Sequence, residues 1–454
     1  MVAPLTETYA RALAGWQGLQ APPEALAVAR LGFTDCAGVM LAGRAEDAVR
    51  CLQYYVRAQG GHGRARLVSG ADRVGMVQAG LVNATAAHAL DYDDFAFSNH
   101  PSAVLVPAVL AAADAAGGAS GRCMAMAYLL GYEVWSDLMV REQDLFYDRG
   151  WHPTSVLGPI GAAAAASVVL GLDAVRTRHA LALAASDSGG VFENFGTMAK
   201  PYHGGRAAAA GLNAAALAAA GLAASATALE GRHGLMRALS PQGRVDLETP
   251  AQVGQLWRSA AMRLNIKKHP TVGSSQRVID AVLALNRNQR LDPAQVRSID
   301  VHISERHAAV MPYHRPQDTL QAKFSIEFAI ACALVHDAVG FEQLTDAGVR
   351  DPALQRLMGL VTIHTTDAFE PDWRDAAPFD IVHVTLTDAR TVSSPQVRRA
   401  AGHADTPLTD AQLWAKFLGC ATHAGVTRDA ARALFDAMQC IDSLSGPDAI
   451  PLPA

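Results

Sequence analysis

The sequence lacks the glycine-rich signatures of nucleotide and flavin binding and the serine motif of common hydrolases. No G-x-G-x-x-G follows a predicted strand, and neither G-x-x-x-x-G-K-[ST] nor G-x-S-x-G occurs in the 454 residues. Nucleotide and flavin chemistry therefore has no support in the sequence, and we expect a protein without a cofactor.

Charged residues are also scarce, at 18% of the chain, and the formal net charge is −5. Without a basic surface to hold a phosphate backbone, nucleic acid is not an expected partner. Half of the residues are hydrophobic. Because so few charges remain to cover the surface of a chain of this size, we expect a homodimer.

The six cysteines show neither C-x-x-C pairs nor the spacing of zinc sites, which favours reduced core residues of a cytoplasmic protein. The first ten residues have neither the basic nor the apolar region of a signal peptide. Alanine-rich runs reach the length of a membrane span, but Gly, Ser, Asn and His interrupt them. We therefore expect buried helices and no membrane partner.

Hydrophobic periodicity predicts a mainly α protein with two domains. Apolar residues recur at helical spacing through the first 265 residues and again after Thr409, which opens a T-x-x-Q capping box. Between them, residues 296–303, 360–365 and 380–386 alternate as half-buried strands. We expect a large all-helical domain, formed by residues 1–265 and 400–454, and a smaller α+β lid domain at 266–399.

Three polar stretches interrupt the helical part, at 88–102, 150–155 and 196–206. Their titratable side chains are His88, Asp91, Asp93, Asp94, His100, His152, Lys200, His203 and Arg206. Helix capping and a solvated loop would explain one such stretch. Three of them beside apolar helices in one domain indicate a shared pocket.

Structural interpretations stay open for several of these residues. His88 continues a helical pattern and is more often a satisfied core histidine. Asp93 and Asp94 would serve as well as helix caps or ion-pair partners as they would as catalysts. Lys267 and Lys268, at the expected domain boundary, can equally be a solvated helix end.

The remaining chemistry is acid and base catalysis by side chains. An aspartate between histidines and apolar walls can have its pKa moved toward the working pH, where histidine already titrates. Cations gather in two places, at Lys200 and Arg206 with His203 between them, and at Lys267–Lys268. Such cations suit a small di- or tricarboxylate that loses a proton next to a carboxylate. Metal-site spacing such as H-x-x-x-H or H-E-x-x-H is absent, so no metal is expected.

Several motifs then occur in a fixed order. They are H-A-L-D-Y-D-D…H-P-S, G-W-H-P-T-S, G-T-M-A-K-P-Y-H-G-G-R-A-A, L-E-G-R-H-G and A-K-F-S-I-E-F. In this order the chain resembles the MmgE/PrpD family, from about residue 35 to residue 413. The family comprises 2-methylcitrate dehydratase, cis-aconitate decarboxylase and iminodisuccinate epimerase.

The resemblance implies a cofactor-free dimeric enzyme with a helical domain, a lid domain and an active site between them. Asp91 and His100 match the Asp and His of the family's first active-site segment, His152 matches the His of its G-x-H-P motif, and Lys200 matches the Lys of G-T-M-x-K. Tyr313 is a match for a lid tyrosine, and Lys267 for the lysine that opens the lid segment. We take these as catalytic and substrate-binding residues, together with Lys268, His203 and Arg206 for substrate.

Two departures from the family pattern bear on the substrate. The decarboxylase-like members have a Thr soon after the acidic residues, whereas this chain has Phe95-Ala96-Phe97. Many members carry a Cys and a His after the lid lysine, whereas residues 271–276 here read T-V-G-S-S-Q. These departures make decarboxylation of cis-aconitate the least supported reaction.

Three functions stay open at this point. The first is an enzyme that removes a proton next to a carboxylate and then eliminates water or returns the proton to the other face. The second is a carboxylate-binding protein that has lost activity, against which the presence of Asp91, His100, His152 and Lys200 argues. The third is a metal-dependent hydrolase, which the missing ligand spacing disfavours.

Overall fold

The computed structural model describes residues 4–70, 72–370 and 376–453. Contacts divide the chain into two compact units, the first made of Met1–Asn265 and Asp410–Ala454, the second of Ile266–Thr409. The predicted fold class, mainly α with a smaller α+β part, is confirmed. The second unit ends at Thr409 rather than at residue 399, where the periodicity had placed its end.

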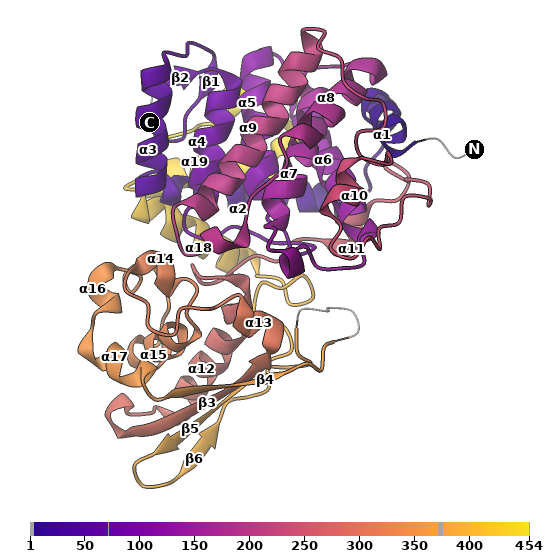
Figure 1. The fold of residues 1–454 in the computed structure, drawn as a ribbon. Helices are drawn as coiled ribbons and strands as arrows, with labels where there is room; N and C mark the ends of the chain where they lie inside the picture. The colour runs from indigo at the N-terminus through magenta and orange to yellow at the C-terminus, as the bar shows by residue number, and fades with distance from the viewer. Residues whose placement is uncertain (1–3, 71, 371–375, 454) are drawn as a thin grey trace. The chain divides into compact units, whose positions relative to one another are not determined.

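The first unit is built from helices (Figure 1). They are α1 (Leu5–Ala14), α2 (Pro23–Gly43), α3 (Asp47–Gln59), α4 (Met76–His88), α5 (Pro101–Ala116), α6 (Gly121–Arg141), α7 (Pro153–Val169), α8 (Ala174–Ser186), α9 (Ala199–Ala219), α10 (Leu235–Leu239), α11 (Arg258–Met262), α18 (Asp410–His423) and α19 (Arg428–Gln439). The only strands described in this unit are the two-residue pair β1 (Ala65–Arg66) and β2 (Arg73–Val74).

Helix α9 packs against α4, α7 and α8 in the middle of the first unit. Small residues make this close approach possible. A Cβ added at Gly205 would lie 2.0 Å from Thr85 Oγ1 on α4, and one added at Gly211 would lie 2.4 Å from the Ala162 Cβ on α7. The alanine-rich sequence of α9 thus fixes its distance from the two helices that carry neighbouring polar stretches.

Helix α2 is long and apolar enough to cross a membrane by length and composition alone. However, 78% of its most apolar window is buried inside the protein, as in a core helix. All six cysteines are free thiols, and Cys36, Cys123, Cys332 and Cys420 are buried.

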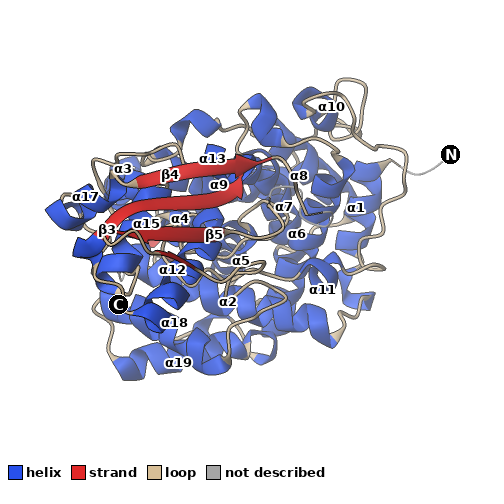
Figure 2. Cartoon of the chain, turned by 90° about the horizontal axis from the view of Figure 1, so that it is seen from below, coloured by secondary structure: helices blue, strands red, loops and turns tan. Residues whose placement is uncertain are grey.

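The second unit holds one four-stranded sheet in the order β4-β3-β5-β6 (Figure 2). Its strands are β3 (Val296–Ser304), β4 (Val361–Thr366), β5 (Ile381–Leu386) and β6 (Thr391–Ser393), and its helices are α12 (Gln276–Gln289), α13 (Glu305–Ala309), α14 (Thr319–Ala322), α15 (Ile326–His336), α16 (Asp346–Val349) and α17 (Pro352–Met358). Strand β3 runs parallel to β4 and antiparallel to β5. Its alternating Ile299, Val301 and Ile303 are all buried, as the period of two predicts.

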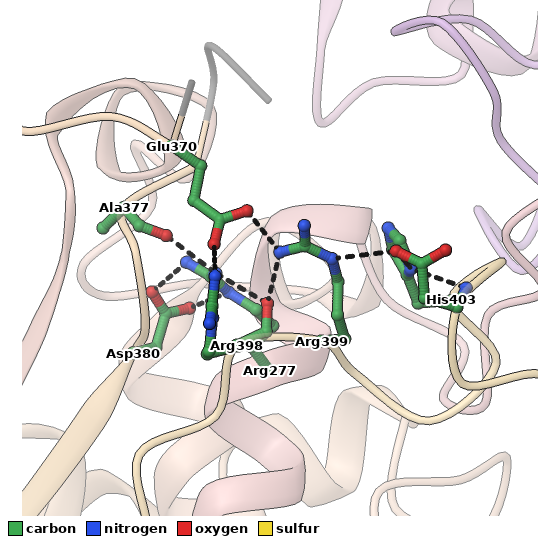
Figure 3. A network of polar contacts seen from close by, with 8 residues as sticks. Arg277, Glu370, Ala377, Asp380, Arg398, Arg399 and His403 are labelled. Carbon is green, nitrogen blue, oxygen red and sulfur yellow. Dashed lines mark hydrogen bonds and ion pairs between the residues drawn. The ribbon is translucent and has the colours of Figure 1, made fainter. Parts of the chain in front are cut away.

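A buried ion network lies next to this sheet (Figure 3). Arg277 on α12 forms a bidentate pair with Asp380, and it also donates to the backbone oxygens of Ala377 and Arg398. Glu370 accepts from Arg398 at 2.7 Å, and its other oxygen lies 2.6 Å from Arg399 Nη1. We call these five charged residues the arginine network, and each carboxylate oxygen in it has an arginine partner.

Candidate active site

The predicted polar stretches stand where helices of the first unit end and begin. The segment after α4 turns sharply at Asp91, whose φ of 50° lies in the left-handed region that aspartate tolerates better than most residues. His100 and His152 each directly precede a proline at the first position of a helix, α5 and α7 respectively. Because proline fixes the helix start, both imidazoles are held at helix N-termini.

Asp93 binds two imidazoles at once. Its Oδ2 atom lies 2.9 Å from His88 Nδ1 and 2.9 Å from His100 Nδ1. A carboxylate accepts hydrogen bonds, so both histidines donate through Nδ1 and carry their lone pair on Nε2. The side chains of His88 and Asp93 are fully buried, and solvent reaches this group at His100, whose side chain is 14% exposed.

The charge states in this group follow from burial and pairing. Burial raises the pKa of Asp93, but His88 and His100 outweigh it and hold that pKa well below its usual range. Burial lowers the pKa of His88 to about 4. Near neutral pH the pair is therefore an ionised carboxylate with a neutral imidazole at His88.

Asp91 forms a second buried pair, with the lysine of the third polar stretch. Lys200 Nζ on α9 lies 2.6 Å from Asp91 Oδ1, and both side chains are almost completely buried. The ammonium also lies 5.2 Å from the centre of the Phe195 ring. This pair places one fixed positive charge beside the imidazoles.

His152, which directly precedes α7, lies next to His88 and His203. Its Nδ1 lies 3.1 Å from His203 Nδ1, and its ring centre lies 6.0 Å from that of His88. Burial and then Lys200 lower the pKa of His152 well below its usual range, and burial lowers the pKa of His203 to about 4. Both rings are neutral near pH 7, so one Nδ1 donates to the other.

Two imidazole nitrogens in this group lack a hydrogen-bond partner within the described part of the chain. They are His88 Nε2 and His152 Nε2, and both are buried. A buried polar atom without a partner costs about 1–3 kcal/mol and calls for an explanation. A ligand that donates a hydrogen bond to His88 Nε2, and that donates to or accepts from His152 Nε2 according to the tautomer of that ring, would satisfy both.

The structure brings five of the predicted site residues together: Asp91, His100, His152, Lys200 and His203. Arg206, further along α9, donates to the Gly189 backbone oxygen, which is a structural contact. Lys267, Lys268 and Tyr313 belong to the second unit. Lys267 is buried there, and Lys268 pairs with Asp280 at 3.5 Å, so their part in the site stays a prediction.

Sequence reasoning missed His88 and Asp93 as members of the site. The interpretation of His88 as a satisfied core histidine is wrong, because only its Nδ1 is hydrogen bonded. Asp93 is an ion-pair partner, one of the two structural roles considered, but its partners are site histidines. A histidine at the last turn of a helix with an acidic residue five positions later was the available signal.

The same residues also form a candidate ligand set for a metal ion. Donor atoms of His88, Asp91, Asp93 and His100 all lie within 4.8 Å of one another. Helix-face spacing could not predict this set, because three of its members follow the end of α4. Here Asp93 holds both Nδ1 atoms and Lys200 holds Asp91, so a metal ion would have to displace these protons and the ammonium. The absence of a metal stays a prediction.

Comparison with known proteins agrees with this arrangement. The family model described as the MmgE/PrpD N-terminal domain matches residues 7–248, and the one described as the MmgE/PrpD C-terminal domain matches residues 269–442. A mouse protein named cis-aconitate decarboxylase is 26% identical over 381 residues, covering 81% of this chain and 76% of its own length. The human protein of that name is 28% identical, covering 75% and 71%.

A further relative, a cis-aconitate decarboxylase-like protein of Aspergillus oryzae, is 28% identical over 76% of this chain and 75% of its own length. The relatives thus span both units of the fold. The expectation of an enzyme of lyase type acting on a carboxylate is supported at this level. Since the two family models together match most of the chain, it belongs to the MmgE/PrpD family of enzymes.

Proposed function

We propose that this enzyme moves a proton at a carbon next to a carboxylate of a small di- or tricarboxylate, without a cofactor. The outcome is loss of water, as in a 2-methylcitrate dehydratase, or inversion at that carbon, as in an iminodisuccinate epimerase. One observation carries the proposal. Two buried, neutral imidazoles, His88 and His152, each keep an Nε2 without a hydrogen-bond partner within the described residues, beside the Asp91–Lys200 pair.

The roles follow from the charges. An unprotonated imidazole can act as the base for a carbon acid near pH 7, since its lone pair is available. Burial, which lowers the pKa of both imidazoles, keeps them unprotonated at that pH. Lys200 supplies the positive charge that stabilises the enolate formed when the proton leaves. His100, whose side chain is 14% exposed, would take a proton from solvent on Nε2 and pass it to a leaving hydroxyl.

Asp93 has a supporting part in this proposal. By accepting from Nδ1 of His88 and of His100, it fixes both rings in the tautomer that carries its lone pair on Nε2. It also stabilises the imidazolium that forms after a proton is taken. Asp91 sets the position of the Lys200 ammonium through the 2.6 Å contact.

Decarboxylation of cis-aconitate is the second candidate, and the names of the relatives favour it. In that reaction the bond to the departing carboxylate breaks as carbon dioxide leaves, and its electron pair ends in a new bond from carbon to hydrogen. One acid then suffices, whereas dehydration needs a base and an acid. The two departures from the family pattern, at residues 95–97 and 271–276, argue against it.

The test is an incubation in D2O with a panel of di- and tricarboxylates that includes 2-methylcitrate and cis-aconitate. An epimerase should place deuterium at the carbon next to a carboxylate without loss of water, whereas a dehydratase should remove the proton of that carbon and release water. Release of carbon dioxide from cis-aconitate would select the second candidate. Activity that EDTA abolishes and Zn²⁺ restores would contradict a cofactor-free reaction and assign a metal to the four ligands.

The homodimer and the cytoplasmic location stay proposals from the sequence. Sedimentation at micromolar protein tests the first, and a monomer of 47.8 kDa would contradict it.

A further inference from the structure

The chain passes between the two units twice. A residue at or shortly after each passage is hydrogen bonded to one short segment of the site. We call residues 91–95, which carry Asp91 and Asp93, the acidic segment. The first passage runs from Asn265 to Ile266, and the second from Thr409 to Asp410. The bonds described next all lie within a single unit.

Asn265, the last residue before the first passage, pairs with Phe95 at one end of the acidic segment. The backbone nitrogen of Phe95 donates to the oxygen of Asn265 at 3.0 Å, and the reverse bond is 2.9 Å. The side-chain amide of Asn265 also donates to the Phe95 oxygen at 3.0 Å. Three hydrogen bonds thus join this end of the segment to the first passage.

Lys416 holds the other end of the segment. It lies on α18, the helix that begins at the second passage. Its ammonium donates to the Tyr92 backbone oxygen at 2.9 Å and lies 2.6 Å from Asp35 Oδ1 and 4.1 Å from the centre of the Tyr92 ring. Because the Lys416 and Asp35 side chains are 4% and 1% exposed, water offers this cation no ready alternative.

The two passages are also joined to each other inside the second unit. The Ile266 nitrogen donates to the Gly402 oxygen at 2.8 Å. Gly402 has a φ of 90°, and a Cβ there would lie 2.0 Å from the Ile266 oxygen, so no other residue fits at this crossing. Asp280 on α12 accepts a hydrogen bond from the backbone nitrogen of the preceding residue, Ala401, at 2.7 Å.

We propose that Lys416 and Asn265 are positioning residues, which hold the acidic segment in place from the two passages between the units. The inference rests on the proposed function, since it assigns these residues to the same site. Tyr92 and Phe95 flank Asp93, and Tyr92 directly follows the left-handed Asp91. A shift of either passage would therefore displace the carboxylates of Asp91 and Asp93, which orient Lys200 and the two histidines.

The experiment compares three variants of the full chain. Lys416→Met removes the ammonium and keeps an unbranched side chain, and Asn265→Ala removes the side-chain bond to Phe95. Arg66→Met is the matched control, because Arg66 is another mostly buried cation of the first unit that binds a carboxylate, Asp114, and backbone oxygens. The carboxylate and backbone oxygens that Arg66 binds belong to Asp114, Pro447 and Ile450, outside the acidic segment. Its loss therefore reports the cost of removing a buried cation alone.

We expect Lys416→Met to lower kcat about 100-fold, the order of effect of a misplacement of 1 Å. KM should stay within about threefold, because Lys416 makes no substrate contact in this scheme. Asn265→Ala should also lower kcat with little change in KM, but by a smaller factor. Arg66→Met should leave kcat unchanged. A kcat that falls equally in Lys416→Met and Arg66→Met would overturn the inference.

Amide hydrogen exchange provides a readout that needs no substrate. We expect faster exchange in the peptide covering 91–97 in Lys416→Met and Asn265→Ala, and unchanged exchange there in Arg66→Met. This result supports the positioning role even if the wild-type enzyme turns over none of the carboxylates tested, in which case the proposed function alone has failed. Equal exchange in all three variants and the wild type would overturn the inference whatever the enzyme's activity.

Discussion

Each unit of this enzyme buries a group of charged side chains, and the two groups differ in how completely they are paired. In the arginine network every carboxylate oxygen of Asp380 and Glu370 meets an arginine. In the first unit, the group around Asp93 is rich in histidine, and two of its buried imidazole nitrogens have no partner within the described residues. The Arg277–Asp380 and His88–Asp93 pairs are equally buried, but only the first has a partner for every polar side-chain atom of its carboxylate.

The comparison separates two uses of a buried charge. A saturated network adds rigidity and costs much to break, because removal of one partner strands the other. An unsaturated network destabilises the protein while no ligand is bound. A ligand that supplies the missing hydrogen bonds removes this cost and is bound more tightly for it. The type of side chain agrees with this division, since arginine stays protonated whereas histidine changes its charge near pH 7.

The largest expected effect is on turnover in the histidine-rich group. His152→Gln should lower kcat by roughly 10²–10⁴, the contribution of one acid or base group. Asp91→Asn should lower it by roughly 10², because the Lys200 ammonium loses the contact that positions it. The melting temperature should change little in His152→Gln and should fall in Asp91→Asn, which leaves the Lys200 ammonium buried without its carboxylate. Both variants should stay folded and partly keep carboxylate binding. Steady-state kinetics with a melting curve and a binding titration measure all three. Near-wild-type kcat in either variant would remove that residue from the mechanism.

The arginine network should respond in the opposite way. Arg277→Met should lower the free energy of unfolding by about 3–5 kcal/mol, because it leaves the Asp380 carboxylate buried without its partner. The kcat of the folded fraction should not change. Arg398→Gln is the control, since Arg398 is 72% exposed and its pair with Glu370 should contribute about 0–1 kcal/mol. If urea titrations gave the two variants equal losses in the free energy of unfolding, burial would not be what determines the cost of removing an arginine.

Lys200→Met probes the one strong cation of the first group. We expect a loss of about 2–4 kcal/mol of transition-state stabilisation, measured as kcat/KM, by analogy with removal of one donor to a developing oxyanion. Both kcat and substrate affinity should fall, because the ammonium meets substrate and enolate alike. Kinetics that match the wild type would leave Lys200 only its structural contact with Asp91.

The smallest effect is the dependence of stability on pH. The pKa of His88 is about 4 in the folded protein, below the value of 6.5 expected when it is exposed, and that of His203 is lowered to about 4 as well. Between pH 4 and 6.5 the unfolded chain binds more protons, so stability should rise with pH across this window and level off above it. We expect about 1–3 kcal/mol in urea titrations. A stability that is flat from pH 4 to 6.5 would mean that these imidazoles become charged in the folded state.

Much of this arrangement could be predicted from local patterns. Helical spacing and alternation predicted the fold class. The Pro after His100 and after His152 was an available signal for the two helix starts. The group around Asp93 could not be predicted, because it depends on the left-handed turn at Asp91 and on the tight approach of α4 and α9. Neither a backbone angle nor a helix distance appears in a hydrophobic pattern.

The boundary of the second unit was missed by ten residues for a similar reason. Residues 400–409 contain no helix or strand that periodicity could assign to either side. Their membership in the second unit comes from single bonds, such as the one between Ile266 and Gly402 and the one between Ala401 and Asp280.

The close approach at Gly205 has a consequence for anyone who edits this sequence. Replacement by alanine is the usual prescription for a stiffer helix, worth about 1 kcal/mol in a helix interior. Here the added methyl group would meet Thr85 Oγ1 at 2.0 Å and the Leu81 oxygen at 2.4 Å, so α9 would have to move away from α4. Lys200 and His203 would move with it, away from His88. A library built to raise thermostability would therefore select, at this one position, for a well-folded protein whose reacting groups no longer meet.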